Sequence, residues 1–431
     1  RARDIKNHTV ENLDYYLELI EENVTRAGGK VFFADDAAAA NKYVVDLAKA
    51  RGVKTVIKSK SMVSEEMGLN HHFENAGIES VETDLGEYII QLAGETPFHI
   101  VAPAIHKSRQ DVSELFHEKL GAARSEDITE LGREARRQLR QKFIQADMGI
   151  TGANFIVAET GTVVLVTNEG NGRMSTSMPK LHVAITGMEK VVPSMDDLGT
   201  FLRLLIRSGT GQRLTSYVTA VTGPRRAGEV AGPEEFHLVI VDNGRSKLLA
   251  NPELRESLNC IRCGACLNAC PVYRKVGGHA YGWVYPGPIG AIVSPVLTGI
   301  GDAKNLPYAS SLCGACREAC PVRINIPRML LVLRRELTEG ATYPTEKRAA
   351  MSERIAFRLW RIGFQNPALL RLGAAFAKVA QMPFVRNGRI RSAPFMSGWT
   401  RYRTLPALPG TSFRDRWKRL RNEDGNKDKG G

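Results

Sequence analysis

The first 245 residues alternate short apolar runs with longer amphipathic stretches. The runs are rich in β-branched residues and have the length of strands. They lie at residues 31–33, 53–57, 78–81 and 99–102. The stretches between them, such as residues 36–51 and 84–93, are long enough for crossover helices. Strands that alternate with helices at this spacing predict βαβ units and a mainly parallel sheet.

The pattern changes after a long charged helix that we predict at residues 128–147. Thr160-Gly161 joins apolar runs at residues 154–159 and 162–167, which indicates a β-hairpin. The elements predicted next are a Gly-, Asn- and Ser-rich loop at 168–177, a strand at 182–186, a helix at 196–207, and strands at 217–221 and 236–241. With a helix at 15–27 ahead of the first strand, one α/β domain that ends near residue 245 accounts for all of these elements.

The rest of the chain is predicted to be mainly helical. The helices are placed at residues 245–257, 328–338, 351–364 and 367–379. Beyond them regular patterning is lost, residues 386–421 are basic with interspersed aromatic side chains, and residues 422–431 are predicted to be disordered. We therefore expect an α/β domain at 1–245, a cysteine-bearing domain at 246–340 and a helical, basic extension at 341–431.

Composition indicates the compartment and the kind of partner. Hydrophobic residues make up 43% of the chain, and no apolar run reaches the roughly 18 residues of a membrane span. The net charge of +13 indicates attraction to acidic surfaces, while no helix-turn-helix or aromatic RNA-binding pattern favours nucleic acid. Seven cysteines, absent from the first 259 residues, fit a reducing compartment. We expect a cytoplasmic protein with a trimmed N-terminus and no signal peptide, whose basic tail contacts anionic lipid or an acidic partner.

The seven cysteines lie in two motifs, the first at residues 260–271 and the second at 313–321, which share the internal repeat Gly-Ala-Cys-x-x-x-Cys-Pro-Val. The first has the C-x2-C-x2-C-x3-C-P spacing of ferredoxin-type iron–sulfur sites, in which three neighbouring thiolates hold one cluster and the fourth reaches the other. Zinc is the alternative, but zinc sites usually take two ligands from each of two knuckles. We predict two clusters, the first held by Cys260, Cys263, Cys266 and Cys320 and the second by Cys270, Cys313 and Cys316.

The second cluster is one cysteine short, because Ser310 occupies the position that matches Cys260. Three explanations stay open: a 3Fe-4S cluster, a 4Fe-4S cluster with a non-cysteine fourth ligand, and a 4Fe-4S cluster with an open iron. We favour four irons with a special ligand. The candidates are Ser310, Ser311, Asp302, His279, water and a group from another subunit.

The spacing of the two motifs also bears on the fold. The 42 residues between Cys270 and Cys313 exceed the spacing of compact bacterial ferredoxins. They indicate the helical, ferredoxin-like dicluster arrangement of respiratory iron–sulfur subunits. Two clusters in one domain form a short electron relay.

The α/β domain has no G-x-G-x-x-G after its first strand and no P-loop, so neither a classical dinucleotide site nor a P-loop nucleotide site is supported. Lys58 and Lys60 follow the second predicted strand, where α/β sheets present ligands, and Arg173 lies in the Gly-rich loop. These three cations form a possible anion site, with a solvated loop and helix cap as the alternative. Catalytic residues stay unassigned. The histidines at 71, 72 and 106 have no metal-ligand spacing, and we expect surface or core histidines.

Four stretches carry a resemblance to a known family. They are Lys58-Ser59-Lys60-Ser61-Met62, Glu159-Thr160-Gly161-Thr162, Asn168-Glu169-Gly170-Asn171 and the cysteine motifs with Ser310-Ser311-Leu312 before the second. In these the chain resembles the iron–sulfur subunits, or B components, of three-component bacterial L-lactate utilisation systems. The resemblance implies a lactate-utilisation domain similar in fold to the sugar-phosphate isomerase and CoA-transferase superfamily, and a family pattern of seven cysteines.

The resemblance also implies a function and partners. We expect an electron-transfer subunit of a complex that oxidises L-lactate to pyruvate, acting with a cysteine-rich-domain subunit and a second lactate-utilisation-domain subunit. The acceptor is expected to be quinone-linked at the inner face of the cell membrane. The alternative is that this chain itself carries the lactate dehydrogenase site, in its α/β domain or at the open iron of the second cluster.

Overall fold

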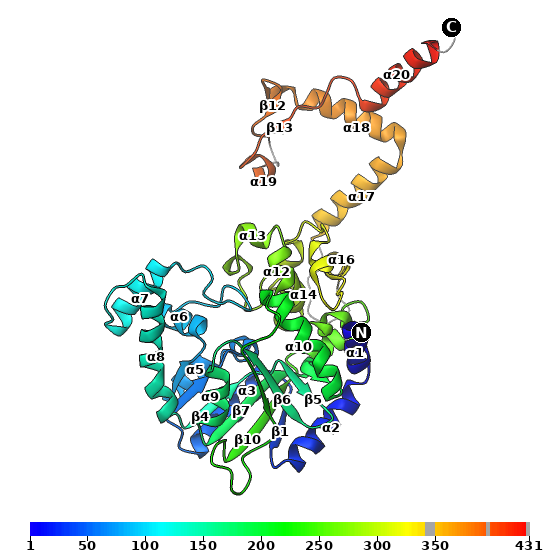
Figure 1. The fold of residues 1–431 in the computed structure, drawn as a ribbon. Coiled ribbons are helices and arrows are strands. Elements are labelled where there is room, and N and C mark those ends of the chain that lie inside the picture. The colour runs from blue at the N-terminus through cyan, green and yellow to red at the C-terminus, as the bar shows by residue number, and fades with distance from the viewer. Residues whose placement is uncertain (341–349, 394–396, 428–431) are drawn as a thin grey trace. The chain divides into compact units, whose positions relative to one another are not determined.

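The computed structural model describes residues 1–340, 350–393 and 397–427 (Figure 1). By its internal contacts the chain forms two compact units, Arg1–Arg348 and Ala349–Gly431. The α/β part and both cysteine motifs belong to the first unit, so a domain boundary at residue 245 stays a prediction from sequence.

A wholly parallel sheet forms the centre of the first unit (Figure 1). Its six strands are β1 (Lys30–Ala34), β2 (Thr55–Lys58), β3 (Glu79–Glu82), β4 (Met148–Thr151), β7 (Leu181–Gly187) and β10 (Glu235–Val241). Their order is β1-β10-β7-β4-β2-β3, and every neighbouring pair is parallel. The predicted strands at 31–33, 53–57, 78–81, 182–186 and 236–241 are confirmed.

The strand predicted at residues 99–102 is wrong. The segment lies in the loop between β3 and β4, and the imidazole Nδ1 of His99 accepts the backbone N–H groups of Val101 and Ala102. Local hydrogen bonds of this kind satisfy the backbone in a turn and compete with a strand ladder.

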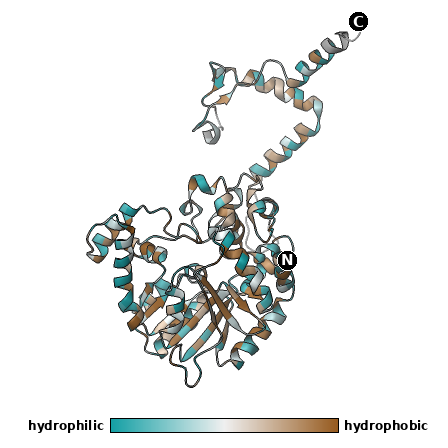
Figure 2. Ribbon diagram, viewed as in Figure 1, coloured by the Kyte–Doolittle hydropathy of each residue, from teal (hydrophilic) through white to brown (hydrophobic). Residues whose placement is uncertain are grey.

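Helices cover both faces of the sheet. Those of the α/β part are α1 (Ala2–Glu11), α2 (Leu13–Arg26), α3 (Ala37–Ala50), α4 (Met62–Glu66), α5 (Leu69–Asn75), α6 (Leu85–Ala93), α7 (Arg109–Leu120), α8 (Ile128–Gln145), α9 (Asn171–Ser177) and α10 (Met195–Thr210). Alternate strand residues enter different cores, as Val56 packs with the α3 and α5 side and Ile57 with the α6 and α8 side. Because both faces are buried, the central strands β7 and β10 are largely apolar, and hydrophobic residues are frequent in the strands of the first unit in Figure 2.

A second sheet of four strands packs beside the first. It contains β5 (Phe155–Val157), β6 (Thr162–Thr167), β8 (Val191–Val192) and β9 (Tyr217–Val221), in the order β8-β5-β6-β9. The antiparallel β5–β6 pair confirms the predicted hairpin, whose turn needs Gly161 at φ +68. The loop predicted at 168–177 is only partly right, since α9 takes up residues 171–177. There Thr176 and Ser177 donate side-chain hydrogen bonds to the carbonyl of Arg173.

Short helices carry the cysteine motifs. They are α11 (Arg245–Ala250), η2 (Arg255–Asn259), α12 (Ala265–Ala269), α13 (Tyr273–Val276), η3 (His279–Tyr281), α14 (Gly287–Thr298), η4 (Leu306–Tyr308), α15 (Ala315–Ala319) and α16 (Ile326–Glu339). The predicted helix at 245–257 is broken into α11 and η2 at Pro252, which has no N–H to donate. Leu267 and Met329 share one hydrophobic core with Phe155 and Phe201 of the α/β part.

The second unit is small and open. It contains α17 (Met351–Gln365), α18 (Pro367–Ala380), η5 (Met382–Phe384), α19 (Ser397–Thr400), α20 (Phe413–Lys427) and a sheet of β11 (Val385–Arg386), β12 (Arg389–Ile390) and β13 (Leu405–Pro406). The predicted helices at 351–364 and 367–379 are confirmed, and neither α17 nor α18 has a buried residue. Helix α20 extends to Lys427 and residues 428–431 lie outside the described part, so the disorder predicted from residue 422 stays a prediction. Among the described residues we find no helix with the length and apolarity of a membrane span.

Candidate metal centres

Cysteines from both motifs line one pocket at the N-terminal end of α12. They are Cys260, Cys263 and Cys266 of the first motif and Cys320 of the second. The rest of the lining is apolar, with Ile100, Ile289 and Ile324 among its members. The structure therefore brings together the four residues predicted to hold the first cluster, although one of them is separated from the others by more than 50 positions of sequence.

The environment of these sulfur atoms fits an iron–sulfur cluster. Backbone N–H groups of Arg262 and Ile324 donate to the Sγ atoms of Cys260 and Cys320, both at 3.4 Å. Such bonds stabilise thiolates. Burial raises the pKa of Cys263 to about 12, so its thiolate is stable in this apolar pocket only when a metal compensates the charge.

The three remaining cysteines gather at the other end of α12. Cys270 and Cys316 are buried and Cys313 is exposed. The charges of Cys270 and Cys313 both act on Cys316, whose pKa is raised to about 11, chiefly by burial. The pKa of Cys313 is lowered, chiefly by hydrogen bonding from the backbone N–H of Ala315. The second set therefore lies close to the surface, whereas the first set is enclosed.

The two motifs have the same local geometry. Arg262 and Leu312 both have positive φ, at 60° and 56°, and each precedes one of two matching cysteines, Cys263 in the first motif and Cys313 in the second. In the first motif the N–H of Arg262 donates to Cys260 Sγ at 3.4 Å, and in the second the N–H of Leu312 donates to Ser310 Oγ at 3.1 Å. The hydroxyl of Ser310 therefore occupies the structural position of a cysteine sulfur.

The other candidates for the fourth ligand lie in different surroundings. His279 hydrogen-bonds through Nε2 to the carbonyl of Thr96 at 2.8 Å. Asp302 is exposed, and Ser311 hydrogen-bonds with Cys313. Ser310 is thus the candidate that the repeat itself places at the second site.

A buried ion network connects the carboxyl end of the sheet to the first motif. Arg245 makes two hydrogen bonds to Glu66, at 2.8 and 2.9 Å, and one to Glu189 at 2.8 Å. Tyr285 and Asn243 donate to the same Glu66 carboxylate, each at 2.7 Å. Burial opposes ionisation of Glu66, but the Arg245 guanidinium outweighs it and lowers the pKa of that carboxyl.

Arg262 extends this network to the edge of the cysteine pocket. Its guanidinium lies 4.5 Å from the ring centroid of Tyr285 and 3.3 Å from the carboxylate of Glu189. Its Nη1 atom is buried and has no hydrogen-bond partner among the described residues. A buried, unsatisfied donor beside Cys260 is what an anionic cluster would complete. Sequence reasoning missed this network, because single charged residues in apolar segments form no motif.

The predicted anion site is surrounded by carboxylates. Lys58 is fully buried, and its Nζ hydrogen-bonds to Glu82 at 2.5 Å, to Asn70 at 2.8 Å and to Glu65 at 3.2 Å. Burial disfavours its charge, but Glu82 and Glu65 outweigh burial and raise the pKa of Lys58. Its charge is therefore already neutralised by protein groups.

Lys60 and Arg173 have different environments. Lys60 Nζ donates to the carbonyl of Val101, and burial lowers its pKa, although nearby carboxylates oppose that shift. One of these is Glu169, whose own pKa is raised to about 7, first by burial and then by Asp84. Arg173 is exposed on α9. Anion binding by these residues stays a prediction.

Three family models match consecutive parts of the chain. Residues 17–241 match the LUD domain, residues 256–324 match the 4Fe-4S dicluster domain, and residues 333–422 match the C-terminal domain of lactate utilisation protein B. The second match covers both cysteine motifs. The protein therefore carries iron–sulfur clusters, in agreement with the predicted cofactors.

Known relatives extend along almost the entire chain. Lactate utilization protein B of Bacillus licheniformis is 50% identical over 98% of this chain and 88% of its own length. The proteins of that name from Shouchella clausii and Geobacillus thermodenitrificans are 48% and 49% identical over 98% and 99% of this chain, and each is covered to 88%. The chain belongs to the lactate utilization protein B family.

Proposed function

We propose that this chain is the electron-transfer subunit of a multi-subunit complex that oxidises L-lactate to pyruvate. The observation that carries the proposal is the presence of two cysteine sets at opposite ends of one short helix, α12. When bound, the two clusters supply one-electron transfer. The names of the relatives, which refer to lactate utilisation, support lactate as the electron source.

The two sets are close enough for a relay. Cys266 belongs to the first set and Cys270 to the second, and four residues of helix span about 6 Å. The enclosed first set contacts the α/β part through Arg262 and Glu189, whereas Cys313 brings the second set to the surface. We therefore place the exchange of electrons with a partner subunit or acceptor at the second set.

The alternative places the lactate dehydrogenase site in this chain. It is not favoured, because Lys58 is buried and paired with carboxylates and because burial lowers the pKa of Lys60. A negatively charged hydroxy acid would have to approach Glu82 beside Lys58, or Asp84, Glu87 and Glu169 beside Lys60.

Lactate-driven reduction of the clusters tests this proposal. We expect lactate to bleach the visible absorbance of the clusters when the chain is purified with its partner subunits. The isolated chain should show no bleaching with lactate and full bleaching with dithionite, which controls for intact clusters. Bleaching of the isolated chain by lactate would contradict the electron-transfer assignment and favour a dehydrogenase site within it.

We further propose that Ser310 Oγ is the fourth ligand of the second cluster. Changing Ser310→Ala should release the iron that Ser310 Oγ holds and give a three-iron EPR signal in the oxidised protein. Changing Ser310→Cys should keep four irons and raise the potential of the second cluster by on the order of tens of millivolts, because a softer thiolate favours the reduced iron. Iron analysis and EPR-monitored redox titration measure both effects.

Ser311→Ala is the matched control, since Ser311 is adjacent but does not occupy the position of a cysteine sulfur. It should leave the iron content unchanged. A three-iron signal at full occupancy in the unaltered protein, or four irons in Ser310→Ala, would contradict ligation by Ser310.

The positive charge of the second unit supports a contact between this unit and an acidic surface. Residues 349–431 contain 17 Lys and Arg but five Asp and Glu, so they carry +12 of the chain's net charge of +13. Exposed aromatic side chains such as Trp360 and Phe376 accompany these charges. Anionic lipid at the inner face of the cell membrane and an acidic partner subunit both fit this surface, and the cysteine-rich-domain and second lactate-utilisation-domain subunits stay predicted partners.

A further inference from the structure

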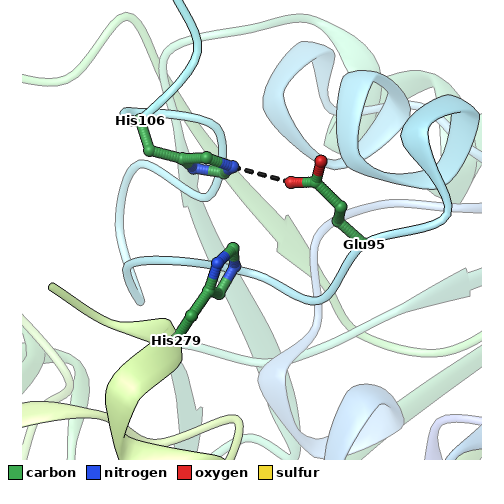
Figure 3. Close-up of side chains that lie close together, drawn as sticks. All are labelled: Glu95, His106 and His279. Carbon is green, nitrogen blue, oxygen red and sulfur yellow. Dashed lines mark hydrogen bonds and ion pairs between the residues drawn. The ribbon is translucent and has the colours of Figure 1, made fainter.

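Two histidines and a glutamate meet at a site outside the cysteine pockets (Figure 3). Glu95 and His106 lie in the loop between α6 and α7, and His279 begins η3, shortly after the first cysteine motif. Their ligand atoms all lie within 4.8 Å of one another. His279 is exposed and the other two are partly buried, so an ion has access from solvent.

We propose that Glu95, His106 and His279 bind a divalent transition metal ion of the Zn²⁺ class, separately from the iron–sulfur clusters. Two imidazoles and one carboxylate are a donor set that such ions favour, with a further position left for water. In a tetrahedral site the ligand atoms lie about 3.3 Å apart, so binding requires the pair of Glu95 and His106 to open by about 0.5 Å and His279 to move closer to them by up to about 1.5 Å.

The orientation of His279 is set by a neighbouring carbonyl. Its Nε2 lies 2.8 Å from the backbone oxygen of Thr96, which can only accept a hydrogen bond. Nε2 therefore carries the proton, and Nδ1 has a free lone pair. A ligating histidine usually donates its other N–H to a group of this kind.

Glu95 is also prepared for ligation. Lys107 pairs with its Oε1 and is the main cause of its lowered pKa. Oε2 faces His106 Nε2 at 2.8 Å (Figure 3). The ion would take the place of the hydrogen between Oε2 and Nε2, while Lys107 would stay as a hydrogen-bond partner of the ligating carboxylate.

The backbone around Phe98 fixes the distance between the two segments. A Cβ added to Gly278 would lie 1.6 Å from the carbonyl oxygen of Phe98, so only glycine permits this approach. The Phe98 ring packs against His106 and His279, with centroids 4.8 and 5.0 Å apart. This packing orients His106, whose Nδ1 has no hydrogen-bond partner among the described residues. The three donors are thus held in place by packed elements, as preorganised metal sites require.

Without an ion, Glu95, His106 and Lys107 form a hydrogen-bonded network. Affinity for metal therefore distinguishes a metal site from such a network. We would equilibrate the cluster-containing chain with ZnCl₂, remove free ion, and measure zinc by mass spectrometry and X-ray absorption at the zinc edge. We expect about one zinc per chain, with nitrogen and oxygen neighbours and no sulfur. His279→Ala and Glu95→Gln should each lower the affinity for zinc. Loss of a hydrogen-bond partner of a metal ligand costs roughly 10–100-fold in affinity, and loss of a ligand itself should cost more.

His71→Ala is the matched control, because His71 forms an exposed pair with Glu74 and should not affect zinc binding. Iron content and cluster EPR signals should be the same in all variants, so failure here is distinguishable from failure of the electron-transfer assignment. Sulfur neighbours at the zinc edge, absence of bound zinc, or unchanged binding in His279→Ala would each overturn the proposal.

Discussion

Changing Cys320→Ala is expected to disrupt the first cluster and to leave the second intact, although Cys320 belongs to the second motif. The structure places Cys320 in the same pocket as Cys260, Cys263 and Cys266, so its loss removes one of four thiolates from that set. Iron content should fall below about eight per chain, because the first cluster loses at least the iron that Cys320 holds, and the EPR signal of the second cluster should stay unchanged.

Cys313→Ala is the matched change in the same motif. It should affect only the second cluster, since Cys313 is exposed and interacts with Cys316. Comparison of the two variants by iron analysis and EPR separates crossed ligation from ligation within each motif. Loss of the second cluster in Cys320→Ala, with the first intact, would contradict the crossed arrangement.

Changing Arg245→Met is expected to destabilise the first unit strongly. Arg245 is 1% exposed and ion-paired with both Glu66 and Glu189, which are also buried. Removing the cation leaves two buried carboxylates without their main partner, which costs about 3–5 kcal/mol. We expect the thermal midpoint to fall by on the order of 10 °C.

The control is Arg124→Met, which removes a guanidinium paired with Glu114 at the surface. Exposed pairs contribute little, so its midpoint should stay close to that of the unaltered protein. Arg245→Lys should have a thermal midpoint between those of Arg245→Met and the unaltered protein, because an ammonium keeps the charge but cannot make the bidentate contact with Glu66. Equal midpoints for Arg245→Met and Arg124→Met would show that the network does not stabilise the fold.

Much of the fold could be predicted because its signals are local. The strands of the parallel sheet are continuous β-branched runs, and the hairpin carries Thr160-Gly161 between two such runs. The run at residues 99–102 has the same composition, yet its backbone bonds to the imidazole of His99. Apolar composition alone does not distinguish these two outcomes.

The candidate metal ligands also differ in whether the sequence predicts that they lie close together. The spacing of the cysteines predicted which ones meet, because the repeat encodes the crossed geometry. Spacing also led us to expect an ordinary surface or core histidine at position 106, whereas the fold brings it to His279 and Glu95. That meeting depends on the close approach of Gly278 to Phe98, which no local pattern reveals.

The central claim is that one compact unit holds two clusters side by side. It is tested most directly by EPR of the fully reduced chain, with spins and iron quantified on the same sample. Because Cys266 and Cys270 lie on one short helix, we expect two reduced clusters per chain whose spectrum is broadened by magnetic coupling between them. A single cluster per chain, or two clusters whose signals add without coupling, would contradict the account.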